Sequence, residues 1–474
     1  MDYTAQLNTK FSQLGPLLIG PGSIFTPKHW NKSNINVIDE TSVYTPVRAG
    51  TTFGQTARFT QPKRATLQTE YLLEITLSAS TPAATAAYVN NLGDQILRRV
   101  VHRYGSAILH EYDGEYQQLW QRLTTNEVNE EGRNALTLGG LPLSVSGAGE
   151  AQRADALTNG LVLYVPLNRL WFSQHLDEAW MPEAYATEGE LEITLQALDQ
   201  LVYNAVVRPA VGGAVPSPFA APGNQPTVDG IRLITREVTL TVPEKLARLN
   251  YYETDRGLLT HFLDLERQPR VDLTGTGGAA PREFRIRLDN IRLDMQEIFF
   301  VVRRGLGAAT PVDEAAVDDP WSGDNLEAPT FDTSAFPATR VQSSLGAVYI
   351  DTMLDDVVGV AGGAGTGGIV SYRLEANGKR LFDDQSELVG RAWVRRLYHP
   401  DAQARYPIYQ ISFSADPENT KNVYSFQNAA NLGNLELVLT MQDFPADQAA
   451  VLDVWVHSHN IIQSRRGDVV KSLK

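Results

Sequence analysis

The sequence reads GSAILHEYDGEYQQLWQRL from Gly105 to Leu123 and GKRLFDDQSELVGRAWVRR from Gly378 to Arg396. In each stretch a strand-like segment ends at the turn glycine, and acidic and polar residues follow. A Trp-x-Arg then stands at the same distance from the glycine, as Trp120 with Arg122 and Trp393 with Arg395. This self-similarity predicts that the chain carries one fold twice. Two similar modules suit two wall elements of an assembly better than a single active site.

Length and composition agree with two packed domains. The chain has 474 residues and a mass of 52.2 kDa, which exceeds what one hydrophobic core usually holds. Apolar residues make up 43% and charged residues 20%, as expected for a globular protein. No apolar run approaches the ~20 residues that span a bilayer, and no secretion signal is recognisable. There are no cysteines, which excludes disulfides, thiolate metal sites and cysteine nucleophiles.

The charge is unevenly distributed. The net charge of −14 argues against a protein that binds nucleic acid phosphates over its whole surface. We also expect no sequence-specific nucleic acid binding. Residues 1–64 nevertheless carry seven Lys and Arg against three Asp and Glu, and residues 456–474 carry four against one. The ends are basic and the body is acidic. One interpretation of this pattern is ordinary variation in surface charge. The other is that the two termini face an anionic partner.

Period-two alternation of apolar and polar residues predicts that the chain is mostly β-strand, with each strand burying one face. The best examples lie at residues 73–78, 191–196, 238–242, 286–289 and 435–441. Glu297 to Arg303 (EIFFVVR) is more continuously apolar and indicates a more deeply buried strand. Asn377-Gly378 predicts a two-residue hairpin turn, since both positions require positive φ. The alternation favours antiparallel sandwiches. The best helices are predicted at about 113–124 and 385–398.

Pro- and Gly-rich stretches suggest where the domains divide. Residues 209–230 (PAVGGAVPSPFAAPGNQPTVDG) lack periodicity and form the best candidate linker. We therefore predict an N-terminal arm at 1–45, a first domain at 46–208, a second at 231–456 and a C-terminal tail at 457–474. Long loops at 126–160, 305–344 and 359–368 indicate contacts with other chains, with plain surface decoration as the alternative.

The residues that could carry chemistry give no coherent site. No nucleophile elbow and no zinc-binding HExxH pattern occur. His457 and His459 share a strand face and could contribute to a metal site, but no third ligand is identifiable, so two solvated histidines are the default. Paired carboxylates occur at Asp113/Glu115, Asp264/Glu266 and Asp383/Asp384. Asp113 and Asp383 are interpreted as opening the predicted helices. We predict no catalytic, cofactor-binding or metal-binding residues.

Several segments, in order along residues 50–456, resemble the double jelly-roll major capsid proteins of icosahedral double-stranded DNA viruses, in particular the large nucleocytoplasmic ones. The similar segments are Gly93 to Thr125, Leu161 to Ser173, Glu190 to Leu195, Leu293 to Arg303, Asn377 to Phe382 and Ile408 to Leu439. The chain departs from the family pattern at Asn168-Arg169, at Asp177 to Glu188 and at Gln427-Asn428. These differences concern the branch of the family and the details of the lattice.

The resemblance implies an all-β protein of two tandem eight-stranded jelly rolls with a few short helices and long surface loops. It implies a non-enzymatic major capsid protein that forms homotrimeric, pseudo-hexagonal capsomers, which tile the virion shell around double-stranded DNA after synthesis inside the host cell. Its partners would be neighbouring capsomers and minor capsid or penton proteins, with an internal viral membrane facing the basic termini. Residues 305–344 would project outward, and the helices with Trp120 and Trp393 would lie near the base or between subunits.

An alternative from another class is a two-domain β-sandwich hydrolase or carbohydrate-binding protein that acts on glycans. Such a protein requires a carboxylate pair facing a cleft, with aromatic residues clustered beside it. The seven tryptophans are scattered along the chain and mark no platform in the sequence.

Overall fold

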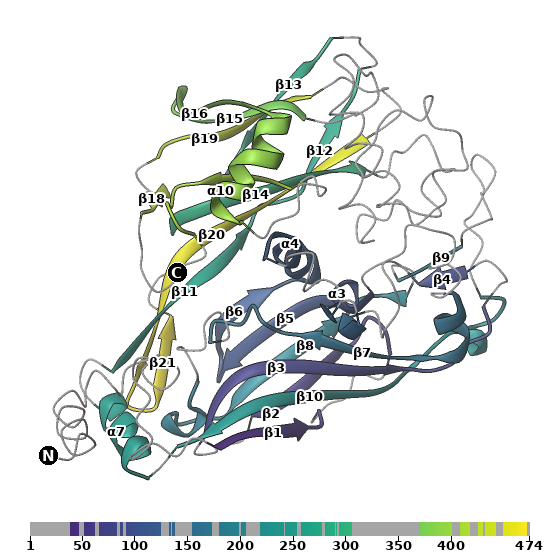
Figure 1. Cartoon of the computed structure of the whole chain (residues 1–474), viewed down its shortest axis with the longest axis vertical. Helices are drawn as coiled ribbons and strands as arrows, with labels where there is room; N and C mark the ends of the chain where they lie inside the picture. Colours follow the sequence, from purple (N-terminus) through teal and green to yellow (C-terminus); the bar gives the residue numbers. More distant parts are fainter. Residues whose placement is uncertain are drawn as a thin grey trace, which may run out of the picture.

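The computed structural model describes most of both halves of the chain (Figure 1). The described residues are 38–46, 52–61, 66–82, 86–88, 92–124, 132–133, 135–137, 154–172, 180–198, 201–204, 219–240, 242–253, 257–276, 280–289, 291, 293–305, 369–400, 408–417, 425–429, 432–441 and 449–471. The predicted outer loop at 305–344, apart from Gly305, and most of the predicted loops at 126–160 and 359–368 lie outside them.

The N-terminal half forms a sandwich of two four-stranded antiparallel sheets. The first sheet has the order β1 (Ile38–Tyr44), β10 (Val228–Thr239), β3 (Thr66–Leu77), β7 (Leu161–Pro166). The second has the order β2 (Thr56–Gln61), β8 (Gly189–Leu195), β5 (Leu97–Tyr104), β6 (Ala107–Tyr112). A short pair, β4 (Ala86–Tyr88) with β9 (Val202–Asn204), stands apart.

The C-terminal half repeats this arrangement. One sheet has the order β11 (Leu258–Arg267), β20 (Ala449–Arg465), β14 (Asp294–Gly305), β17 (Tyr409–Ser412). The other has the order β13 (Arg282–Arg287), β19 (Leu435–Met441), β15 (Ile369–Ala376), β16 (Lys379–Ser386). Three short strands extend the first of these sheets, namely β12 (Val271–Thr274), β18 (Gln427–Asn428) and β21 (Asp468–Lys471).

Matching the strands in chain order shows that the two halves have the same topology. β1, β10, β3 and β7 correspond to β11, β20, β14 and β17, and β2, β8, β5 and β6 correspond to β13, β19, β15 and β16. The prediction of two tandem eight-stranded sandwiches is confirmed, and the repeated stretch falls on equivalent elements: β6 and the helix after it in one half, β16 and the helix after it in the other.

The helices are few and short. Among the described residues they include α3 (Leu92–Gln95), α4 (Gly114–Thr124), α7 (Val242–Glu253), a π-helical segment at Val389–Val394 that continues into α10 (Arg395–Tyr398), and 3₁₀ turns at Pro182–Ala184 and Pro222–Asn224; residues 154–159 are helical as well. Among these described helices, none combines the length and the apolar character needed to cross a membrane. The predicted helix at 113–124 is confirmed. The one predicted from residue 385 begins only at residue 387, because β16 remains paired with β15 through Ser386. Asp383 therefore lies in a strand and opens no helix.

The predicted hairpin turn between β15 and β16 is confirmed. Asn377 and Gly378 have φ values of 51° and 72°. Both lie in the left-handed region that this turn requires and that asparagine and glycine tolerate best. The Asn377 amide donates a hydrogen bond of 3.0 Å to the carbonyl of Asn434, which fixes the turn against the start of β19.

The strand pairing shifts three predicted boundaries. β1 begins at residue 38, inside the predicted arm, and pairs with β10. β10, which the sequence placed at the start of the second domain, pairs with β1 and β3 and closes the first sandwich. Of the predicted linker, residues 209–218 lie outside the described ranges and 228–230 belong to β10. Alternation identifies β10 as a strand, but it carries no information about partners more than 150 residues away.

The predicted C-terminal tail is also largely sheet. β20 runs to Arg465, and β21 folds back on it through a turn in which Arg466 and Gly467 have φ values of 49° and 81°. Gly467 then accepts a hydrogen bond of 2.8 Å from the Ala186 amide of the first sandwich. Residues 457–471 are therefore part of the second sandwich, since they complete its β11–β20 pairing.

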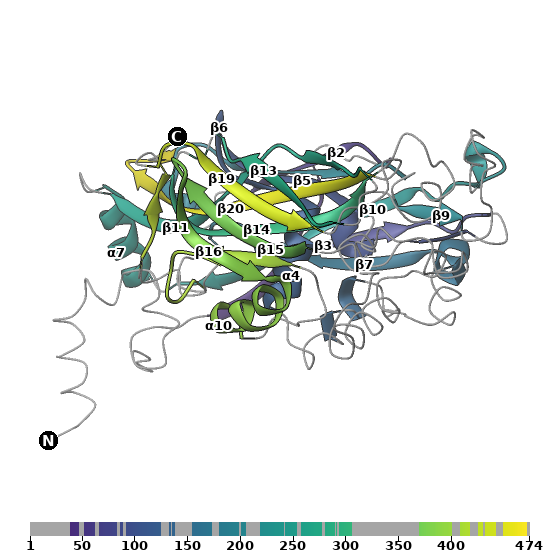
Figure 2. The same cartoon turned by 90° about the horizontal axis from the view of Figure 1, so that it is seen from above.

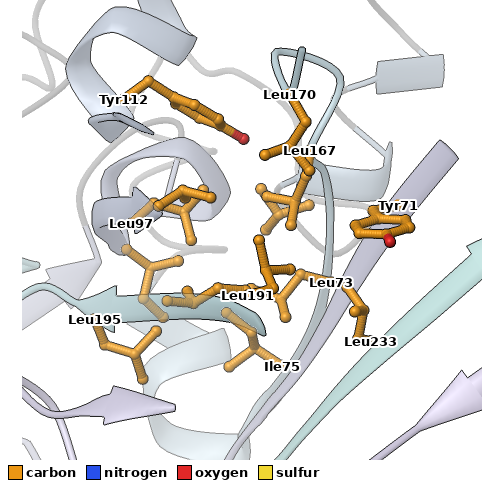
Figure 3. Close-up of a cluster of buried hydrophobic side chains, with 14 of the residues drawn as sticks. Tyr71, Leu73, Ile75, Leu97, Tyr112, Leu167, Leu170, Leu191, Leu195 and Leu233 are labelled. Carbon is orange, nitrogen blue, oxygen red and sulfur yellow. The ribbon is translucent and has the colours of Figure 1, made fainter. Parts of the chain in front are cut away.

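Within the described ranges, the buried apolar side chains form two clusters. Figure 3 shows part of the first, where leucines of facing sheets interdigitate. The second fills the C-terminal sandwich. β14 contributes to both: Ile298 and Phe300 face the second cluster, whereas Phe299 and Val301 face the first. The continuous apolar run of this strand is thus explained by burial on both faces.

Candidate functional site at the junction of the two sandwiches

Helix α4 lies where the two sandwiches meet (Figure 1). Asp113 caps it, because its carboxylate accepts a hydrogen bond of 2.7 Å from the Tyr116 amide. Gly114 is the first residue of the helix and packs directly against the backbone of neighbouring elements. A Cβ at this position would lie 2.1 Å from the Leu97 carbonyl oxygen and 2.3 Å from that of Asp94. The helix start is therefore held tightly against β5 and α3.

Gly114→Ala is expected to lower the free energy of unfolding by about 3 kcal/mol, because backbone atoms cannot yield as a flexible side chain does. Helix propensity alone would give the opposite sign, with Ala about 1 kcal/mol better than Gly. Urea unfolding followed by circular dichroism measures the difference. Gly223→Ala is the matched control, since nothing lies within 4 Å of its added Cβ. A neutral or stabilising Gly114→Ala would show that the helix start is loosely packed.

Trp120 is the central contact of the junction. Its side chain is 7% exposed and packs edge-on against Phe299 of β14, with ring centroids 6.1 Å apart. It also lies 4.9 Å from the ring of His457 of β20 and 5.5 Å from that of His399. Interface and core packing were open alternatives for this residue. The structure shows packing between the two sandwiches of one chain.

Arg169, which follows β7, covers the other side of Trp120. Its guanidinium lies 4.0 Å from the centroid of the indole ring and donates a hydrogen bond of 3.0 Å to the Tyr116 hydroxyl. The Tyr116 hydroxyl also contacts His457. Burial raises the pKa of Tyr116 to about 12, although the nearby Arg169 lowers it, so the hydroxyl keeps its proton. A cation–π contact between Arg169 and Trp120 thus adds to the aromatic packing at the junction.

A buried carboxylate lies beneath the aromatic stack. Glu297 is fully buried, with an oxygen 3.3 Å from His399 Nε2 and the other 3.7 Å from His457 Nδ1, and it accepts a hydrogen bond from Gln410. Burial alone would raise the pKa of Glu297, but the charge and hydrogen bond of His399 lower it to about 2. Burial lowers the pKa of His457 to about 4. Glu297 therefore stands in a buried site with two histidine rings and an amide against its carboxylate.

Ion pairs at the rim connect the two halves. Arg267 of β11 binds Asp113, Glu115 at 2.6 Å and Asp453 at 3.1 Å. Arg270 binds Glu115 at 3.2 Å and Asp453 at 3.0 Å. Burial would lower the pKa of Arg267, but the attraction of Asp113 and the other carboxylates raises it above its usual value. Two arginines of the second half thereby hold the first turn of α4.

Each of the three carboxylate pairs noted in the sequence has at least one member with a structural partner. Asp113 and Glu115 lie in the rim network just described. Asp264 binds Lys471 at 2.5 Å, and Asp384 accepts a hydrogen bond of 3.1 Å from Arg373. Ion pairing of this kind neutralises carboxylates and tethers strands.

The two histidines of β20 are buried rather than solvated. His457 lies in the junction, and His459, which is 7% exposed, is 2.9 Å from a ring nitrogen of His261 on β11. The default interpretation from sequence is wrong because β20 is covered on both faces. Within the described ranges, no group of three or more metal-ligating side chains gathers around them or elsewhere.

Sequence reasoning identified Trp120, Asp113 and His457 but missed Arg169, Arg267 and Glu297. A weak signal exists for Glu297, since this acidic residue directly precedes the apolar run of β14. The arginines lie far along the chain from the residues they bind, so nothing local indicates their role. Taken together, the junction is a buried contact of aromatic, cationic and acidic side chains between the two modules.

No family model matches the sequence, and no curated protein matches it significantly. Solved structures do match. A chain of the PBCV-1 virus capsid has a TM-score of 0.64 at 14% identity, with 94% of this chain and 99% of that chain covered. The Faustovirus major capsid protein has a TM-score of 0.64 at 10% identity, with 97% and 98% covered. A chain of the Sputnik virophage has a TM-score of 0.53 at 8% identity, with 93% and 88% covered. This chain therefore shares its fold with capsid proteins over nearly its whole length.

Proposed function

We propose that this chain is the major capsid protein of an icosahedral double-stranded DNA virus and builds the shell of its virion. The likeness to the PBCV-1 capsid chain supports the proposal, because it covers 94% of one chain and 99% of the other and so includes both sandwiches and their junction. A pair of similar modules joined by a buried junction suits a shell, since it presents two related walls.

We propose further that three copies form one capsomer. A three-fold assembly of a two-module chain presents six similar walls and can occupy a six-fold lattice position. Neighbouring capsomers and minor capsid or penton proteins would be the further partners. An internal membrane would face the basic N-terminal residues 1–37, which lie outside the described ranges. Assembly would take place inside the host cell.

Light scattering of the purified full chain across a salt series tests the oligomer. We expect a particle of three times 52.2 kDa that persists at high salt. Persistence is expected because the buried centre of a stable contact between subunits is mostly apolar, and ions screen apolar contacts little. A monomer at every concentration would contradict the proposed function.

Nothing in the site favours the glycan-acting alternative. At least one carboxylate of each pair that a hydrolase would use is engaged in an ion pair or hydrogen bond, and the structural neighbours named above are capsid chains. We therefore propose a structural, non-enzymatic role.

A further inference from the structure

The two equivalent helices differ sharply in exposure. Trp120 of α4 is 7% exposed, whereas Trp393, at the same place in the repeat, is 62% exposed. The residues one helical turn to either side of Trp393 are also exposed, Val389 at 37% and Leu397 at 56%. Residues four apart lie on one helix face, so these three form an apolar stripe. Figure 2 shows the helix that ends with α10 projecting beyond the strands of the second sandwich.

The covered helix shows what surface such a stripe fits. α4 packs on the outer face of the sheet β11–β20–β14–β17, where Trp120 contacts Phe299 of β14 and His457 of β20. By strand order, the equivalent sheet of the first sandwich is β1–β10–β3–β7. The second sandwich covers the helix of the first. The helix of the second sandwich has no third sandwich in its own chain to cover it. The equivalent cover would be the first sandwich of a second copy of this chain.

The outer face of the sheet β1–β10–β3–β7 carries an apolar row. Val43 pairs with Ile234, Ile234 with Leu72, and Leu72 with Pro166, so one residue from each strand stands side by side. Leu72 points away from its own core, since its neighbours Tyr71 and Leu73 are the buried ones. Val43 is 56% exposed, and the other three are partly exposed.

Charged residues flank the apolar row on both sides, as in a protein–protein interface. On one side Arg236 binds Glu70 at 3.4 Å, and on the other Arg232 binds Glu74 at 2.6 Å. A cavity of about 630 Å³ opens over the row and is lined by Leu72, Ile234, Pro166 and the Glu70–Arg236 pair, among others. An apolar centre with a charged rim is typical of a protein contact surface. The volume suffices for a large aromatic side chain.

We propose that the stripe formed by Val389, Trp393 and Leu397 docks on the row formed by Val43, Ile234, Leu72 and Pro166 of a second copy of this chain, with Trp393 in the cavity. The contact repeats between chains what Trp120 makes within one chain. It joins two different surfaces, so it is heterologous and closes only as a ring. The inference rests on the proposed function and specifies which surfaces hold three copies together.

A crosslinking experiment tests the contact directly, because the natural chain has no cysteine to interfere. The double variant Trp393→Cys, Leu72→Cys is treated with a short bismaleimide and separated under denaturing conditions. We expect covalent dimers and trimers, whereas each single variant should stay monomeric on the gel. The matched control pairs Trp393→Cys with Leu246→Cys, since Leu246 is an exposed leucine on another helix, α7.

Light scattering of Trp393→Glu gives an independent measurement. Loss of a central aromatic anchor is expected to raise the concentration at which copies dissociate by about 30-fold or more. Leu246→Glu, with the same change at a 53% exposed position, should leave the assembly intact. A trimeric wild-type chain that neither crosslinks nor responds to Trp393→Glu would overturn this inference and leave the proposed function standing. A wild-type chain that is always monomeric would overturn both.

Discussion

Trp120→Ala is expected to lower the free energy of unfolding by about 3 to 5 kcal/mol, the usual cost of removing a buried aromatic side chain. The indole fills the space between Phe299, His399 and His457, and its removal leaves a cavity that two sheets and a helix cannot easily close. It also takes the aromatic face away from the guanidinium of Arg169, which is then buried with less compensation.

Trp393→Ala is the matched control, because this residue occupies the same place in the repeat and is 62% exposed. It should change the free energy of unfolding of an isolated copy by no more than about 0.5 kcal/mol. Urea titration, followed by far-ultraviolet circular dichroism at a concentration where copies are dissociated, measures both variants. Equal losses would contradict the assignment of Trp120 to the junction.

Acidification from pH 7 to pH 5 is expected to destabilise the protein by several kcal/mol. Burial lowers the pKa of His102 to about 3 and that of His457 to about 4, and it lowers the pKa of His110 well below its usual value. His102 shows why a proton is excluded: its Nδ1 accepts a hydrogen bond of 3.0 Å from the Trp171 indole, while Nε2 lies 3.1 Å from a Gln61 oxygen. A doubly protonated ring would lose the bond from Trp171.

The sign of this pH dependence follows from whether the folded or the unfolded chain binds more protons. Between pH 6.5 and about 4 the unfolded chain protonates these histidines and the folded chain does not, so stability falls as pH falls. Each fully buried histidine contributes up to about 1.4 kcal/mol per pH unit in that window. The pKa of Glu297 is low, and its contribution is lost only below about pH 4.5, so it acts later.

Thermal unfolding monitored at half-unit steps from pH 5 to pH 8 tests this expectation. The midpoint should be level between pH 7 and pH 8 and should drop progressively below pH 6.5. A midpoint that stays constant down to pH 5 would mean that the three histidines are more accessible than their packing indicates.

Sequence patterns predicted the strand content, the tandem fold, the Asn377-Gly378 turn and helix α4, because all of these depend on local periodicity or on residues with special backbone preferences. The domain boundaries required knowledge of strand partners, which is why β10 and residues 457–471 were misplaced. The repeat indicated that Trp120 and Trp393 are equivalent. Their difference in burial arises from which module follows each helix, a feature of tertiary arrangement that no local pattern contains.

The closing strands β10 and β20 also set the order of events during synthesis. β10 pairs with β1 across a gap of almost 200 residues, so the first sandwich can be completed once residue 239 has left the ribosome. The second sandwich waits for β20, whose pairing with β11 extends to Ser464, close to the end of the chain. Until then the side of Trp120 that packs on His457 of β20 is uncovered. A nascent chain therefore exposes apolar surface on α4 after the first sandwich is complete. Slowing elongation past residue 239 should increase its dependence on chaperones.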